Sequence, residues 1–264
     1  MDFDPTVARR ILHNRSLRAA HGWSDVYDLG GALATTSDAP IPALNCLMDV
    51  TARDHDIEAL LDIGFALLRA FDREPLVEVT PLDRPKSLAK RLGARGFVRS
   101  TIGSWMRHQG DPADIAVNPD VEVRIAEPDD ARAFAQVLGG STAWLRKIAL
   151  QTTLNAMLEP GNTFYLGCVD GQPVSALHLL IDGNHDGDQV FETAGIYAVG
   201  TLRAHRRHGI SSTLMARAIA DAQAAGCDII GLGTVAGGDA ERLYTKQGFT
   251  RVFTSEMWAL PEGR

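Results

Sequence analysis

A strand, a basic turn and a helix between residues 194 and 214 constrain this chain more than any other segment. Ile196, Tyr197 and Val199 give the first part the β-branched and aromatic character of a strand, and apolar residues at helical spacing follow Leu214. The turn holds adjacent arginines, then Gly209, then small hydroxyl residues. A glycine lets the backbone approach a ligand closely, and the unpaired amides of a first helical turn favour negative charge. The stretch predicts a site for a phosphate-bearing ligand, against the alternative of a basic surface turn with an ordinary serine cap.

A second motif follows in the expected order. After a helix to about Ala225 come an apolar strand at residues 229–235 and a helix that ends in Leu243-Tyr244-Thr245-Lys246-Gln247-Gly248-Phe249. Together with Arg206-x-x-Gly209-x-Ser211, this arrangement resembles the GCN5-related N-acetyltransferases (GNAT), in which the first motif holds the pyrophosphate of acetyl coenzyme A. The resemblance implies the α/β GNAT fold, a mixed, mostly antiparallel sheet flanked by helices.

The resemblance also implies a set of site residues. Tyr244 would protonate the departing thiolate of the coenzyme, and Glu192 would act as general base, with His178 as the weaker rival because a lone histidine among apolar residues usually packs in the core. A main-chain N–H in a bulge of the strand would polarise the thioester. The residues expected to bind the coenzyme are Ala198, Val199, Arg206, Arg207, His208, Gly209, Ile210, Ser211 and Ser212.

The chemistry explains why such groups are needed. A lysine-type amine has a pKa of about 10.4 and must lose a proton before it attacks, and a leaving thiol with a pKa of about 8.5 gains from an acid. Two positions depart from the family pattern: Ser211 stands where the family has Gly or Ala, and Gly237 where many members have an Asn that contacts the pantetheine arm.

The first half of the chain resembles the second. Gly96-Phe97 before Trp105-Met106 mirrors Gly248-Phe249 before Met257-Trp258, at an offset of 152 residues. We therefore expect two tandem GNAT units, with a degenerate unit at 1–110, a linker at 111–120 and the catalytic unit at 121–264. The alternative is one domain with a long N-terminal extension.

Acidic residues indicate that the first unit lacks the coenzyme site. Where the glycine turn would fall, the chain reads Thr51-Ala52-Arg53-Asp54-His55-Asp56, and Leu92 takes the place of Tyr244. Carboxylates at a helix N-terminus would repel a pyrophosphate.

Elements of the first half are expected from their patterns. The sequence predicts an amphipathic helix at 57–70 and a strand at 76–79. It also predicts an N-terminal helix at about 6–20 and a strand at 43–50.

Composition narrows the function classes. The 264 residues carry a net charge of −7, which argues against a nucleic-acid binder, and no apolar run has the length of a membrane span. The acidic, polar N-terminus does not resemble a signal peptide, so we expect a soluble cytoplasmic protein. Three widely spaced cysteines suggest neither a disulfide framework nor a zinc site.

The segment Asp182-Gly183-Asn184-His185-Asp186-Gly187-Asp188 resembles the start of a calcium loop. Its twelfth position is Thr193, with Glu192 one place early, and strands flank it, so a solvated hairpin turn is expected and no metal.

The sequence therefore predicts an acetyl-coenzyme-A-dependent N-acetyltransferase that acts directly on an amine of a small molecule or peptide. Its expected partners are a coenzyme A thioester and an amine acceptor, with a homodimer left open. The alternatives are a non-catalytic coenzyme A sensor or a scaffold protein.

Overall fold

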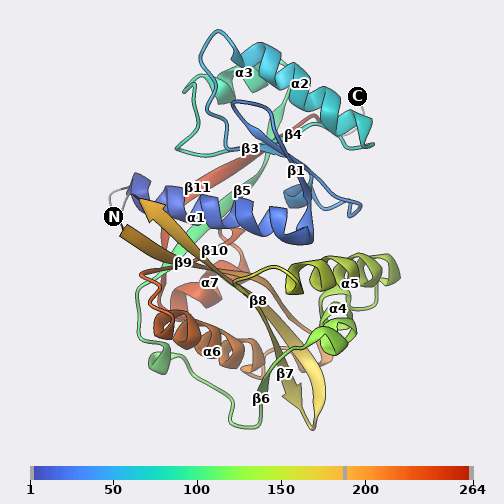
Figure 1. Cartoon of the computed structure of the whole chain (residues 1–264), viewed down its shortest axis with the longest axis vertical. Helices are drawn as coiled ribbons and strands as arrows, with labels where there is room; N and C mark the ends of the chain where they lie inside the picture. The colour runs from blue at the N-terminus through green and yellow to red at the C-terminus, as the bar shows by residue number, and fades with distance from the viewer. Residues whose placement is uncertain (1–2, 187–188, 262–264) are drawn as a thin grey trace.

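One continuous sheet runs through the molecule (Figure 1). The computed structural model describes residues 3–186 and 189–261, and the side chains of residues 184–191 lie outside that description. Within these residues the sheet has eleven strands in the order β1-β2-β3-β4-β11-β5-β10-β9-β8-β7-β6. Neighbouring strands are mostly antiparallel, with β3/β4 and β9/β10 as parallel pairs. The expected mixed, mostly antiparallel α/β sheet is confirmed.

The C-terminal part of the chain supplies one half of this sheet and the helices on both of its faces. Its elements are β6 (Glu122–Ile125), α4 (Ala131–Gly139), α5 (Ala143–Met157), β7 (Asn162–Val169), β8 (Gln172–Asp186), β9 (Gln189–Thr201), α6 (Ile210–Ala224), β10 (Ile229–Val235), α7 (Asp239–Lys246) and β11 (Phe249–Ala259). Leu214 and Ile219 of α6 pack with Ile196 on one face, and Phe134 of α4 packs with Phe164 on the other. Burial of these apolar side chains holds the helices to the sheet.

The N-terminal part follows the same plan. Its elements are α1 (Pro5–Arg18), the π-helix η1 (Ala19–Trp23), β1 (Asp25–Asp28), β2 (Leu33–Thr36), β3 (Leu47–Met48), α2 (Ile57–Ala70), β4 (Leu76–Val79), α3 (Leu88–Ala94) and β5 (Val98–His108). Four short 3-10 turns lie at Pro42–Leu44, Pro112–Asp114, Pro128–Asp130 and Arg203–His205.

The repeat expected from the sequence is confirmed. The series β3-α2-β4-α3-β5 corresponds to β9-α6-β10-α7-β11, and each series contains one parallel pair. Gly96 and Gly248 end the equivalent helices α3 and α7 with the same φ of 87°. Phe97 and Phe249, which follow these glycines, are both buried. The chain is a tandem arrangement of two GNAT-like units.

The two units exchange their last strands. β5 of the first unit lies between β10 and β11, pairing with both in antiparallel register. β11 of the second unit lies between β5 and β4, with Glu256 opposite Val79. The sheet therefore crosses the predicted boundary between residues 110 and 121, and that boundary in the sequence remains a prediction.

Helix α1 precedes the first unit in sequence but covers the sheet of the second. It crosses the middle of the molecule in Figure 1, and Arg10 and Asn14 bond to β9. The Arg10 Nε donates to Thr193 Oγ1 at 3.0 Å, and the Asn14 Nδ2 donates to the carbonyl oxygens of Thr193 and Leu180 at 3.2 Å.

The strand expected at 43–50 is wrong in its extent, since β3 comprises only Leu47–Met48. The preceding residues form a turn because Asn45 bonds to the backbone around it. Its Nδ2 donates to the carbonyl of Ala39 at 2.6 Å, and its Oδ1 accepts from the amide of Ser37 at 2.8 Å. Side-chain bonds of this kind compete with a strand ladder.

Candidate functional site

Strands β9 and β10 separate where the site is expected. Their parallel pairing covers Ile229–Gly231 opposite Thr193–Gly195 and ends there. β9 then continues along β8 to Thr201, and β10 continues along β5 to Val235. Beyond this point β9 and β10 no longer pair with each other, so their facing edges lack inter-strand hydrogen bonds. This opening lies next to the N-terminus of α6.

Strand β9 bulges beside this opening. Between the pairs His178–Tyr197 and Ala176–Gly200, the two residues Ala198 and Val199 stand opposite the single residue Leu177. Ala198 has a φ of 50°, which a side-chain-bearing residue rarely adopts. A bulge of this kind removes main-chain groups from the regular ladder and re-aims them. The strand thus bulges at the two residues named from the sequence, and their role as donors remains a prediction.

The turn before α6 has the backbone that an anion site requires. Arg207 and Gly209 have φ values of 68° and 73°, and Gly209 is the N-cap of α6. Because glycine has no side chain to cap the helix, the first-turn amides of Ile210, Ser211 and Ser212 have no acceptor from the cap or from the helix itself. Residues 206–209 are exposed, so their basic side chains face solvent around these amides.

Asn118, in the predicted linker, supports this turn. Its Nδ2 donates to the carbonyl of His208 at 2.8 Å, and its main-chain N–H donates to Thr213 Oγ1 at 2.9 Å. The contact joins residues 90 positions apart, and a lone linker asparagine gives no sequence signal for it.

Two members of the expected coenzyme set already have internal partners. The Arg206 Nε donates to the carbonyl of Thr201 at 3.0 Å, which folds that side chain back onto the end of β9. The Ser212 hydroxyl accepts from Gln247 Nε2 at 2.9 Å, which ties α6 to the end of α7. For Ser211, the residue that departs from the family pattern, the described part of the chain shows no side-chain hydrogen bond.

Tyr244 on α7 is partly buried against Phe249, with ring centroids 5.9 Å apart. Burial raises the pKa of its phenol, so the hydroxyl stays protonated at neutral pH. Within the described residues no group bonds to this hydroxyl, which leaves its proton available.

Helix α7 is held by Glu241. Its carboxylate accepts from Ser104 Oγ at 2.5 Å, from the amide of Gly237 at 2.6 Å and from Arg251 Nε at 2.9 Å. These bonds, led by the one from Ser104, lower the pKa of Glu241 to about 2. Gly237, the second departure from the family pattern, has a φ of 75° and donates its amide here.

Glu192 lies apart from the bulge. Because side chains alternate between the two faces along a strand, Glu192 lies on the same face as Ala194 and Ile196, which is the face that α6 covers. Six residues of strand, about 20 Å, separate it from Ala198. Its main-chain oxygen accepts from Arg10 Nη2 at 3.0 Å. The structure therefore brings the bulge, the turn and α7 into one region and leaves Glu192 at the other end of β9.

His178 is fully buried, as expected of a core histidine. Its ring stacks on Phe164 at 4.4 Å and on Trp23 at 6.0 Å, and its Nε2 meets Asn162 Oδ1 at 2.7 Å. Burial lowers its pKa well below the usual value, so the ring is neutral at physiological pH.

The sequence analysis did not predict that α1 packs against β9. The Tyr197 hydroxyl donates to Asn14 Oδ1 at 2.7 Å, and Arg18 packs on the rings of Trp23 and Tyr197. A signal was present, because Arg10, Asn14 and Arg18 recur every four residues and form a polar stripe on one face of the helix.

The first unit has a different arrangement at the equivalent turn. Arg91 Nη2 bonds to Asp54 Oδ2 at 2.8 Å, and Arg95 Nη2 bonds to Glu58 Oε2 at 2.6 Å. The carboxylates before and within α2 are thus paired with Arg91 of α3 and with Arg95, the residue that caps α3, and the degenerate character of this unit remains a prediction.

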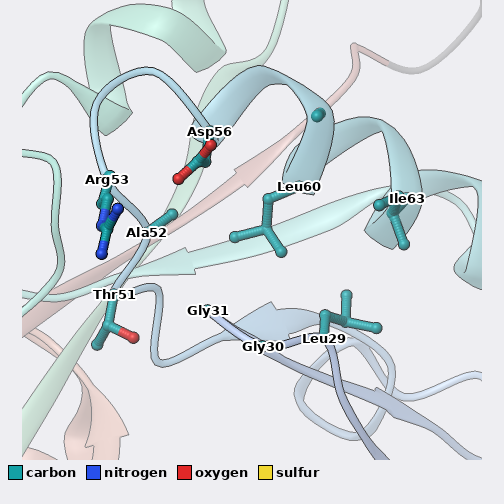
Figure 2. A pocket seen from close by; sticks show the side chains of 10 residues that line it. Leu29, Gly30, Gly31, Thr51, Ala52, Arg53, Asp56, Leu60 and Ile63 are labelled. Carbon is teal, nitrogen blue, oxygen red and sulfur yellow. The ribbon is translucent and has the colours of Figure 1, made fainter.

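A cavity of about 450 Å³ lies beside the same turn. Figure 2 shows Leu60 and Ile63 of α2 near the turn at Gly30 and Gly31, with Asp56 on the loop before the helix. Its walls are mostly apolar with one basic and one acidic residue, Arg53 and Asp56, unlike the basic turn of the second unit.

No cluster of three metal-ligating side chains occurs in the described ranges. The suspected calcium loop falls largely outside them, since the side chains of residues 184–191 are not described. All three cysteines are free and buried. No described helix is long and apolar enough to cross a membrane.

Comparison with known proteins agrees with the fold. Residues 132–249 match the model of the acetyltransferase (GNAT) family. A GCN5-related N-acetyltransferase from Kribbella flavida is similar over 97% of this chain and 96% of its own, with a TM-score of 0.68 and 19% identity. A similar protein from Sphaerobacter thermophilus gives a TM-score of 0.61 with 16% identity, covering 96% of this chain and 93% of its own.

A tandem GNAT protein from the clavulanic acid biosynthesis pathway is also similar, with a TM-score of 0.63 and 16% identity. The match covers 92% of this chain and 85% of that one. Among curated proteins, none matches this chain.

Proposed function

We propose that the protein transfers acetyl from acetyl coenzyme A directly to an amine of a small molecule or peptide, and the match of residues 132–249 to the model of the acetyltransferase (GNAT) family supports this proposal. The observation that carries the proposal is the bulge at Ala198 and Val199, beside the point where β9 leaves β10 and next to the uncapped N-terminus of α6.

The residues present fit the coenzyme. The amides from Arg207 to Ser212 and the exposed basic side chains around them suit a pyrophosphate, since a helix N-terminus favours anions. Ser211 adds a hydroxyl that can donate a further bond. Acetyl coenzyme A supplies the activated acyl group as a thioester, and the chain supplies the groups that bind it and move protons.

The main-chain N–H at Ala198 or Val199 is proposed to donate to the carbonyl oxygen of the acetyl group. A fixed donor aimed at an oxygen that gains negative charge lowers the barrier to attack. The donor belongs to the backbone of a bulge, so substitution of its side chain would not remove it.

Tyr244 is proposed to give its proton to the departing sulfur, because its hydroxyl is protonated and uncommitted. The amine must be neutral when it attacks. Glu192, the base expected from the sequence, lies about 20 Å along β9 from Ala198, beyond direct contact or a single bridging water, so it could accept the amine proton only through a chain of several waters.

The proposal is tested by titrating acetyl coenzyme A into the purified protein by calorimetry. The wild type is expected to bind in the micromolar range, whereas the Arg206→Glu, Gly209→Asp double variant is expected to lose binding by at least about 100-fold, equivalent to about 2.7 kcal/mol. It places carboxylates where a pyrophosphate would lie.

A matched control makes the same changes elsewhere. Arg69 is exposed on α2, and Gly226 has a φ of 89° with open space around it, so Arg69→Glu, Gly226→Asp repeats the charge and the backbone change. The control should bind normally. Absence of binding to folded wild type would refute the proposal, and binding without release of thiol for any amine would favour a coenzyme A sensor.

A further inference from the structure

Two arginines near the C-terminal end of α1 differ sharply in their surroundings. Arg15 is paired with two carboxylates, Glu78 and Asp49. Arg18, one turn later, has neither an ion pair nor a hydrogen bond within residues 3–186 and 189–261. Its Nε is buried without a partner.

Two aromatic rings pack against the Arg18 guanidinium. Its central carbon lies 4.2 Å from the ring centroid of Trp23 and 4.8 Å from that of Tyr197. Stacking of this kind uses the faces of the guanidinium plane and leaves its N–H groups pointing outward along the edges. The side chain is partly exposed, so these edges can be reached from solvent.

None of the carboxylates around this position bonds to Arg18 in the described part of the chain. Arg15 holds Glu78 and Asp49, and the buried Oδ2 of Asp182 lies 3.3 Å from His13 Nε2 without a hydrogen bond. Burial lowers the pKa of Arg18 to about 10, as expected for a buried guanidinium that no carboxylate pairs with. An uncompensated, partly buried cation is costly to the fold and is retained most readily where an external anion completes it.

Arg18 also lies close to the proposed reaction centre. It contacts Tyr197, the residue immediately before the bulge at Ala198. Tyr197 faces α1, on the opposite side of the sheet from α6. Arg18 therefore borders the α1 side of the bulge.

We propose that Arg18 binds a carboxylate of the acceptor, so that the protein acetylates small amines that carry a carboxylate, such as amino acids or short peptides. The inference rests on the proposed function and adds the substrate class. A guanidinium edge matches a carboxylate with two parallel hydrogen bonds. Its positive charge also disfavours a nearby ammonium, which helps the acceptor amine to stay neutral for attack.

The test is a matched panel of amines. Thiol release from acetyl coenzyme A is measured with L-amino acids and dipeptides, each beside its own C-terminal carboxamide. We expect the wild type to prefer acids over their amides by at least about tenfold in kcat/KM, a preference of about 1.4 kcal/mol. In Arg18→Gln the preference should fall to about twofold or less, through a higher KM for the acids with kcat little changed.

Three further variants and measurements sharpen the result. Arg18→Lys keeps the charge without the planar edge and should retain an intermediate preference. Arg9→Gln removes an exposed charge from the same helix and should leave the preference unchanged. Arg18→Gln should be at least about as stable as wild type to heat, because it removes an uncompensated charge.

The inference is overturned if amides serve as well as acids, if Arg18→Gln keeps the full preference, or if only amines without a carboxylate, or no panel member, are acetylated. Calorimetric binding of acetyl coenzyme A, measured on the same samples, separates these outcomes from failure of the proposed function. If the coenzyme binds and neutral amines are acetylated, the transferase proposal stands and the carboxylate site does not.

Discussion

At the scale of single residues, the most direct chemical role is the one proposed for Tyr244. Its ring is fixed by packing on Phe249, and burial keeps its hydroxyl protonated by raising the pKa. A group of this kind can donate a proton without first being charged. The equivalent position in the first unit is Leu92, which is fully buried and has no proton to give.

We expect Tyr244→Phe to lower kcat by about 100-fold, because general acid catalysis contributes factors of this order. KM and the affinity for acetyl coenzyme A should change little, since the ring and its packing remain. Steady-state thiol release and calorimetry measure the two quantities. Glu192→Gln, assayed alongside, should depress turnover most at low pH if the carboxylate accepts the amine proton.

An unchanged kcat in Tyr244→Phe would remove the tyrosine from the mechanism. Tyr27→Phe, on β1 of the first unit, is the matched control and should have no effect on turnover.

At the scale of elements, Glu241 connects α7 to two strands. Its carboxylate joins Ser104 on β5 and Arg251 on β11, and it accepts the amide of Gly237 in the loop before α7. Tyr244 lies one turn further along the same helix. The position of the proposed proton donor thus depends on a carboxylate that reaches strands of both units.

Glu241 should make stability depend on pH. Its pKa is about 2 in the fold against an ordinary value of 4.5, so the fold favours the carboxylate. The stabilisation is fully present above about pH 5 and is lost as the pH falls towards 2. Glu241→Gln should lower the free energy of unfolding by about 2 kcal/mol near pH 7, with the difference shrinking as the pH approaches 2.

Urea denaturation at several pH values measures this difference. Glu122→Gln, at an exposed position on β6, should change the free energy of unfolding little at any pH. A pH-independent loss in Glu241→Gln would assign its effect to packing alone.

The local sequence pattern was sufficient to predict some of the helices and strands. Helix α2 and strand β4 begin and end at the predicted residues, because apolar spacing and flanking turns determine them. The glycine turn before α6 was equally readable, since Arg207 and Gly209 adopt the backbone that their motif implies. The short extent of β3 could not be predicted in this way, because the hydrogen bonds of the Asn45 side chain form the preceding turn and residue propensities do not include such bonds.

Contacts between residues far apart in the sequence could not be predicted from the local sequence pattern. The place of α1 on β9 depends on bonds between residues more than 170 positions apart, such as those of Arg10 and Asn14 to Thr193. The bulge at Ala198 involves the main chain and has no characteristic side chain. Resemblance to a family supplied its position, and the contacts of Arg18 became visible only in the fold.

At the scale of the whole molecule, the exchange of β5 and β11 makes the two units interdependent. β10 has β5 as its neighbour on one side, and β11 has β4 and β5. A chain of residues 121–264 alone would expose the edge of β10 and leave β11 without partners.

We therefore expect residues 1–110 and 111–264, produced separately, to be aggregated or largely unfolded, and to recover folded structure and coenzyme binding when produced together. Unpaired strand edges invite association with other chains. Solubility, circular dichroism and calorimetry of the separate and combined halves measure this. A monomeric, folded 111–264 fragment that binds acetyl coenzyme A would show that the exchanged strand is dispensable.

The strand exchange also fixes the order of events as the chain is made. β11, at residues 249–259, is synthesised after β4 and β5, yet it must enter between these two strands. Until then, the nascent first unit has an open place in its sheet. The sheet of the first unit is thus completed only after the second unit has been synthesised, and the insertion of β11 completes the sheets of both units together.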